Sequence, residues 1–75
     1  MNLSSLRCGE LAAVTGLPAD QALSQRLSAM GVALGKTVRL VRRAALGGPL
    51  QLRVGNTEFF LRQRDAAAIE VSRSG

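Results

Sequence analysis

Residues 26–44 read RLSAMGVALGKTVRLVRRA, and the spacing of the apolar residues changes within this stretch. Leu27 and Met30, with Leu23 before them, recur at the three- and four-residue spacing of one helix face. From Lys36 to Arg43 the apolar residues instead alternate with polar ones, which is the two-residue period of a half-buried strand. The stretch therefore predicts a helix that ends near Met30 and a strand that follows it.

Both ends of the helix carry recognisable capping residues. Asp20 is an N-cap residue, because its carboxylate can accept hydrogen bonds from the first free N–H groups. Gly31 stands where a left-handed residue closes a helix, and Val32 stands where a Schellman closure would pack it back onto Leu27. We expect the helix to run from Asp20 to about Met30.

The remaining elements follow from alternation and turn residues. Beyond a lead-in that contains Leu3 and Leu6, we expect strands over residues 9–14, 36–43, 50–54, 57–62 and 69–71, and one helical turn over residues 63–68. In the strand from Lys36 to Arg43, alternation places Val38, Leu40 and Arg42 on one face, and on the other a basic outer face of Thr37, Arg39, Val41 and Arg43. A polar tail is expected over residues 72–75.

Composition indicates one small domain with an aliphatic core. The chain has 75 residues, of which 47% are apolar, and its only aromatic residues are Phe59 and Phe60. A chain this short buries only roughly 60% of its unfolded surface, so residues 1–75 form a single domain. Because closure hides strand edges, five short strands and one helix predict a mainly β fold, a small barrel, with an open α+β sheet as the alternative.

The residue types argue against catalysis and against a bound cofactor. There is no His, the one cysteine is Cys8, and the five carboxylates are scattered along the chain, so we expect no metal site and no general base for a nucleophile. Cys8 is interpreted as a half-buried thiol that packs like a small hydrophobe. No phosphate-binding loop of the GxxxxGK[ST] kind is present. The sequence predicts a non-enzymatic protein.

Net charge points to an acidic partner. The formal charge is +5, and six arginines come from strands expected to be neighbours and could form one continuous anion-attracting patch: Arg39, Arg42, Arg43, Arg53, Arg62 and Arg64. Binders of single-stranded nucleic acid add aromatic stacking platforms, which two phenylalanines hardly supply, so nucleic acid is disfavoured. No apolar stretch is long enough to cross a bilayer and no secretory signal is evident, so a cytoplasmic location is expected.

Taken together, these residues resemble the FeoA family from end to end. The resemblance rests on the order and spacing of short motifs: Arg26-Leu27 with Met30-Gly31, Gly35 with Val38, Pro49-Leu50, Leu61-Arg62 with Ala66, and Ile69 with Val71. It implies a five-stranded Src-homology-3-like barrel with one α-helix inserted after the first strand. It also implies a partner, FeoB, a membrane protein of ferrous-iron uptake with a cytoplasmic GTP-binding domain, whose transport or nucleotide turnover such proteins are thought to influence.

The resemblance and the charge together suggest how the chain would act. We hypothesise a docking face formed by Arg26, Met30 and the apolar run from Val32 to Leu34, with approach steered by Arg39, Arg42 and Arg43. Anionic lipid of the inner leaflet would also attract the basic surface and hold the protein at the inner membrane when bound. The alternative for the apolar run is packing of the helix end onto the barrel mouth.

Two other functions remain open at this stage. The first is a small basic barrel that binds nucleic acid or serves as a regulatory domain, since the same barrel type occurs in metal-dependent repressors. The second is a GTPase-activating protein with an arginine finger, for which Arg26 or Arg43 could be the inserted residue.

Overall fold

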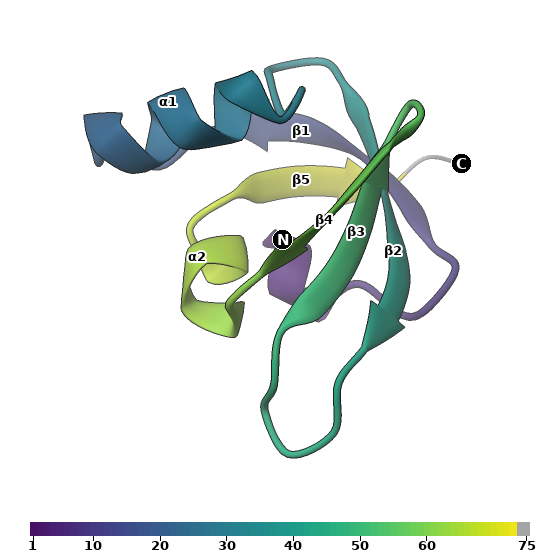
Figure 1. Cartoon of the computed structure of the whole chain (residues 1–75). Helices are drawn as coiled ribbons and strands as arrows, with labels where there is room; N and C mark the ends of the chain where they lie inside the picture. Colours follow the sequence, from purple (N-terminus) through teal and green to yellow (C-terminus); the bar gives the residue numbers. More distant parts are fainter. Residues whose placement is uncertain (74–75) are drawn as a thin grey trace.

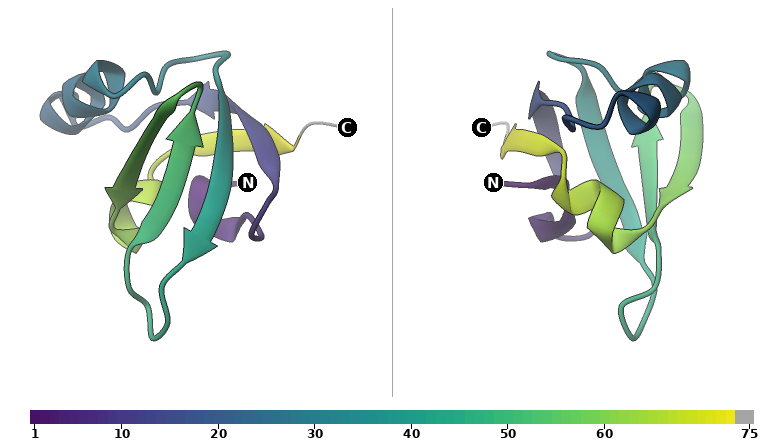
Figure 2. Two further views of the ribbon diagram at one scale, coloured as in Figure 1. Left: turned by 45° about the vertical axis from the view of Figure 1, so that its right-hand side comes forward. Right: turned by 90° about the vertical axis from the view of Figure 1, so that its left-hand side faces the viewer.

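Five antiparallel strands form one sheet in the order β4-β3-β2-β1-β5 (Figure 1). The computed structural model describes residues 1–73. Its elements are η1 (Leu3–Ser5), β1 (Leu11–Gly16), α1 (Gln21–Ala29), β2 (Thr37–Arg43), β3 (Leu50–Val54), β4 (Thr57–Leu61), α2 (Gln63–Ala67) and β5 (Glu70–Arg73). The sheet curls around one core, with β1 and β5 lying across β2, β3 and β4 (Figure 2). This arrangement confirms the predicted mainly β barrel with a helix after the first strand.

Helix α1 begins and ends as the sequence predicts. The carboxylate of Asp20 accepts hydrogen bonds from the backbone N–H groups of Ala22 and Leu23, at 3.0 and 3.3 Å. At the other end Gly31 has a φ of 94°, its N–H donates to the Ser28 carbonyl, and the N–H of Val32 donates to the Leu27 carbonyl at 2.9 Å. The second bond completes the Schellman closure and turns Val32 back into the barrel.

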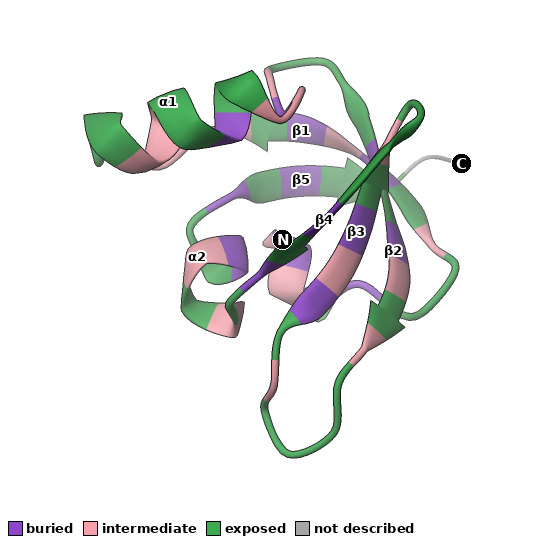
Figure 3. Ribbon diagram, in the orientation of Figure 1, coloured by how far each residue is buried: buried purple, intermediate pink, exposed green. Residues whose placement is uncertain are grey.

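The core is built almost entirely from aliphatic side chains. Figure 3 shows that its buried positions alternate along the strands and face the interior. The buried residues are Leu3, Leu6, Ala12, Val14, Leu27, Val32, Val38, Leu40, Leu50, Leu52, Phe59, Leu61, Ala66, Ile69 and Val71. Leu27 is the one buried residue of α1, so most of that helix is exposed. Within residues 1–73 no polar or charged residue is buried.

A bulge in β2 overturns the predicted faces of its last two residues, Arg42 and Arg43. Leu40 pairs with Leu52, but the next pair joins Arg42 to Gln51, so Val41 is an extra residue on β2. Since side chains alternate along a strand, one extra residue exchanges the faces beyond it. Arg42 is therefore exposed on the outer side, whereas Arg43 is half-buried. The prediction that grouped Arg42 with Val38 and Leu40 is wrong.

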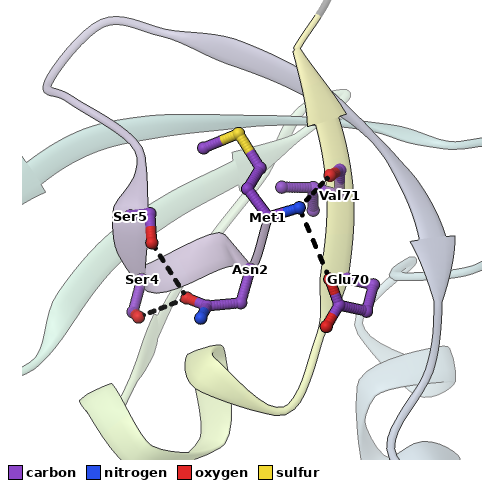
Figure 4. A network of polar contacts seen from close by, with 6 residues as sticks. All are labelled: Met1, Asn2, Ser4, Ser5, Glu70 and Val71. Atoms are coloured by element: carbon purple, nitrogen blue, oxygen red, sulfur yellow. Dashed lines mark hydrogen bonds and ion pairs between the residues drawn. The ribbon is translucent and has the colours of Figure 1, made fainter.

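The N-terminal segment covers one edge of the sheet. The N–H of Val71 donates to the Met1 carbonyl at 2.8 Å, the N–H of Leu3 donates to the Ile69 carbonyl at 2.9 Å, and Asn2 bridges to Glu70. Figure 4 shows the Met1 amino group against Glu70 and the Val71 carbonyl, with the Ser4 and Ser5 hydroxyls donating to the Asn2 side chain. Residues 1–3 thus occupy the outer edge of β5.

The end of the chain also differs from its prediction. Ser72 and Arg73 belong to β5 and pair with Ala13 and Ala12 of β1, so the polar tail does not begin at residue 72. The predicted tail at residues 74 and 75 lies outside the described residues. Among residues 1–73, no helix has the length and apolar character needed to span a membrane.

Candidate protein-binding surface

The apolar run after α1 mostly belongs to the core, and only its end is free. Val32 is fully buried, so its predicted docking role is wrong: the Schellman closure points its side chain inward. Met30 is half-buried and packs against the core. Leu34 is 62% exposed and is the one predicted apolar docking residue that a partner can readily reach.

Arg43 is engaged within the fold. Its guanidinium donates two hydrogen bonds of 2.7 Å, one to the Ser4 carbonyl and one to the Leu6 carbonyl. These bonds hold the segment around η1 against the end of β2. The predicted steering role of Arg43 is therefore corrected to a structural one, and a half-buried, doubly bonded guanidinium also cannot serve as a mobile arginine finger.

The remaining arginines line three hollows of the surface, two of which meet at Phe60. Arg39 lies directly opposite Arg53 in the register of β2 and β3, beside a shallow hollow that Leu11 also lines. Arg42 lines a second hollow, and Arg26 lines a third, between α1 and the end of β4. With Arg43 engaged within the fold, five arginines of the predicted patch are exposed: Arg39, Arg42, Arg53, Arg62 and Arg64.

Phe60 is the residue that sequence reasoning missed. It lies on β4 between Phe59 and Leu61, which point inward, and its side chain is 67% exposed. Phe60 lines two hollows at once: the helix hollow, of about 360 Å³, which it shares with Leu23 and Arg26, and one of about 270 Å³ that it shares with Arg42 and Pro49. The signal was present in the alternation of Phe59, Phe60 and Leu61, which allows only one phenylalanine to face the core.

Phe60 and the residues that line its two hollows form one exposed surface. We define the Phe60 surface as Phe60 together with Leu23, Arg26, Arg42, Pro49 and Arg62. Exposed aromatic and arginine side chains are enriched at protein interfaces, where lysine and glutamate are depleted. The surface therefore has the composition of a protein-binding site, with Arg26 and Arg42 the two predicted residues that it includes.

Electrostatics in the helix hollow favour an acidic ligand. Arg26, Arg62 and Arg64 face two carboxylates there, and both carboxylates have partners: Asp20 caps α1, and Asp65 lies 3.9 Å from Arg64. Within residues 1–73, Arg26 and Arg62 form no ion pair. The hollow therefore has uncompensated positive charge beside an apolar wall.

Residues 1–73 contain no cluster of three or more potential metal ligands. Cys8 is exposed in the turn before β1, which corrects its predicted half-buried position. The pKa of Glu10 lies below its ordinary value, first because its carboxylate accepts the Arg7 backbone N–H at 2.6 Å and further because it bonds Arg73 at 2.8 Å. The Glu10 carboxylate thus joins the turn before β1 to Arg73 of β5.

The profile of the FeoA domain family matches residues 1–73. The chain belongs to the FeoA domain family. A curated relative from Porphyromonas gingivalis is an Fe(2+) transport protein A/Fe(2+) transporter FeoB fusion protein, 35% identical over 95% of this FeoA chain. This chain spans only 8% of that relative's length. The family resemblance seen in the sequence is thereby confirmed.

Solved FeoA structures share the fold along the whole chain. The FeoA protein from Chlorobium tepidum is 31% identical with a TM-score of 0.93, covering 100% of this chain and 71% of that one. FeoA from Stenotrophomonas maltophilia, solved with zinc and described as a prokaryotic SH3 domain protein, is 34% identical with a TM-score of 0.83, covering 96% and 89%. The predicted SH3-like barrel is thus confirmed for this FeoA-family chain.

The barrel also occurs in a different class of protein. A manganese-dependent transcriptional repressor contains it with a TM-score of 0.87 at 21% identity, covering 99% of this chain and 41% of the repressor. At this identity the likeness concerns the fold alone.

Proposed function

We propose that this chain is a non-catalytic accessory protein of ferrous-iron uptake that binds the cytoplasmic side of FeoB and modulates its transport or nucleotide turnover. The observation that carries the proposal is the relative in which the same domain is fused to FeoB in one chain. Fusion keeps the two domains at a high effective concentration, which indicates that they act in contact through a binding surface on the FeoA domain. The Phe60 surface supplies a suitable one.

Contact would centre on Phe60, because few interface residues carry most of the binding energy and these are usually well-buried aromatic or arginine anchors. Phe60 is exposed in the unbound chain, and Leu23 and Pro49 lie in the hollows on its two sides. Docking would bury the apolar side chains of this surface, while Arg26 and Arg62 would pair with acidic groups of the partner and Arg42 would lie at the rim.

The rest of the basic surface would guide the approach. Arg39 and Arg42 are exposed, and the whole chain has a net charge of +5. Charge complementarity between two proteins mainly raises their association rate. Anionic lipid on the cytoplasmic leaflet also attracts each nearby Lys or Arg by about 1 kcal/mol. The protein would therefore be cytoplasmic and peripheral to the inner membrane when bound.

A second candidate, the arginine-finger activator, is favoured by one observation. Arg26 is exposed and has no ion pair within residues 1–73, so its guanidinium is free to enter a nucleotide site. The discriminating assay is GTP hydrolysis by the FeoB cytoplasmic domain with this chain or its Arg26→Ala variant. A large acceleration that Arg26→Ala abolishes would favour the activator; a small effect that both proteins produce favours the accessory role.

Co-purification with full-length FeoB, followed by site-specific crosslinking, tests the main proposal. A photo-reactive amino acid replaces Phe60 in one sample and Leu46 in another; Leu46 is fully exposed in the loop between β2 and β3 and is the matched control. The expected result is a FeoB adduct from position 60 and little from position 46. Failure to co-purify, or equal adducts from both positions, would contradict the proposal.

A further inference from the structure

The two edges of the sheet differ in whether another chain segment covers them. The outer edge of β5 is bonded by residues 1–3. The ladder does not continue from β4 to β5, and α2 spans the gap between these strands (Figure 1). Among residues 1–73, no backbone hydrogen bond joins β4 to any segment other than β3. The edge of β4 is the free edge of the sheet.

The hairpin register fixes which backbone groups of β4 point away from β3. Gly55 and Asn56 form a two-residue turn, so the flanking residues Val54 and Thr57 form a hydrogen-bonded pair. Hydrogen-bonded and non-bonded pairs alternate along an antiparallel ladder, which makes Glu58 and Phe60 non-bonded residues. The N–H and C=O groups of Glu58 and Phe60 therefore face outward and can pair with an added strand.

The space beside this edge is the helix hollow. It runs between α1 and the end of β4 and is lined on one side by Leu23 and Arg26 and on the other by Phe60 and Arg62. Neighbouring strands lie about 4.8 Å apart, so a strand paired with β4 would enter the hollow directly. Its side chains would then lie near arginines and beside the Phe60 ring.

We propose that the free edge of β4 accepts an extended, acidic segment of the partner as a sixth strand. Main-chain hydrogen bonds to Glu58 and Phe60 would provide affinity, and the side chains beside the edge would select for acidic and apolar residues. Arg26 and Arg62 would bind the acidic residues, and Phe60 would pack against an apolar one. The proposal rests on the function above only in naming FeoB as the protein that carries the segment.

The positive charge of the chain favours an acidic segment over a second copy of the chain at the β4 edge. Pairing two β4 edges would place Arg62 and Arg64 of both copies in one interface, and each copy carries a net charge of +5. The arginines of two copies would repel each other at close range, whereas the carboxylates of an acidic segment would be attracted to them. A second copy is therefore an outcome that the experiment must detect, by sedimentation of the free chain.

Amide hydrogen exchange on the unmodified chain is the first test. Two probes are added separately: the cytoplasmic part of FeoB, and a blocked peptide of about ten residues that alternates Glu and Val. The expected result is new protection of the Glu58 and Phe60 amides with both probes, while a peptide alternating Lys and Val gives none. Protection at these amides in the free chain, with a dimer in sedimentation, would assign the edge to a second copy and overturn the proposal.

A proline substitution removes one outward N–H without touching the ladder. Glu58→Pro deletes the donor that an added strand needs, while Glu58→Ala deletes the same side-chain contacts with Gln51 and Arg53 and keeps the donor. The expected result is a Kd about tenfold weaker for Glu58→Pro than for Glu58→Ala, with circular dichroism confirming that both fold. Equal affinities of the two variants would contradict strand addition.

The two probes separate this inference from the proposed function. If FeoB binds but leaves the Glu58 and Phe60 amides exchanging freely, the edge proposal fails and the accessory function stands. If the acidic peptide protects these amides but FeoB does not bind, the edge is a peptide site and the proposed partner is wrong. Absence of both effects would overturn both.

Discussion

At the scale of single residues, two adjacent arginines on β2 have opposite roles. Arg42 is exposed, and its guanidinium donates a 3.4 Å hydrogen bond to the Gln51 side chain on the next strand. Arg43 is half-buried and donates to the carbonyls of Ser4 and Leu6. The bulge at Val41 produces this difference, because it turns Arg43 toward the N-terminal segment.

Arg43→Ala should therefore destabilise the fold far more than Arg42→Ala. Losing Arg43 leaves two carbonyls without their donor, which costs about 1–3 kcal/mol, whereas a surface change such as Arg42→Ala stays within about 0.5 kcal/mol. Urea unfolding of both variants measures the difference. Equal losses of stability would show that the guanidinium of Arg43 does not hold the segment around η1.

At the scale of elements, α1 depends on its two ends. It contributes Leu27 to the buried core and packs Leu23 against it, and its ends are fixed by the Asp20 cap and by the closure at Gly31. Near Gly31, an added Cβ would meet Val54 only at ordinary contact distance, so backbone conformation, not space, makes glycine necessary there.

Gly31→Ala should cost about 1–2 kcal/mol, because a side chain disfavours the left-handed conformation that its φ of 94° requires. Asp20→Ala, at the opposite end, should cost about 1 kcal/mol through loss of the cap. Thermal unfolding followed by circular dichroism gives both values. A neutral Gly31→Ala variant would mean that α1 is held by contacts other than its closure.

The tie between Glu10 and Arg73 should make stability depend on pH on the acid side. The pKa of Glu10 is lowered in the folded state by the Arg7 N–H and by Arg73, so its contribution is present above the unfolded pKa and lost as pH falls through the depressed value. Unfolding by urea from neutral pH to about pH 3 should therefore show a smaller acid-side loss in Glu10→Gln than in the unmodified chain. Identical pH profiles would contradict this.

Local and non-local features differed in how well the sequence predicted them. The cap at Asp20 and the closure at Gly31 involve residues within one helical turn, so both could be predicted from the sequence. The faces of Arg42 and Arg43 depend on a bulge that only the pairing with β3 defines. The exposure of Phe60 depends on which residue of β4 meets the core, and the covering of β5 joins residues 1–3 to residues almost seventy positions away in the sequence.

For the whole molecule, net charge affects how a partner approaches. The chain has a net charge of +5 and exposed arginines around several hollows, which gives it a positive field over much of its surface. Such a field acts on the approach of a partner and is screened within about 10 Å at ordinary ionic strength.

Reversing charge at Arg39 and Arg42 should slow association with FeoB more than it changes dissociation. Both side chains are exposed, and charges at the rim of an interface act mainly through the association rate. Surface plasmon resonance at low and high salt measures both rates. An unchanged association rate at low salt would show that these arginines do not steer the encounter.

If this chain acts by contact through the Phe60 surface, its affinity for the FeoB cytoplasmic domain, measured by calorimetric titration, will depend on Phe60. Phe60→Glu and Leu46→Glu add the same charge at two exposed apolar positions, one inside the surface and one in the loop between β2 and β3. We expect Phe60→Glu to raise the Kd at least about thirtyfold, because Phe60 is an interface anchor. Leu46→Glu should bind with the Kd of the unmodified chain. Equal affinities of the two variants would contradict contact through the Phe60 surface.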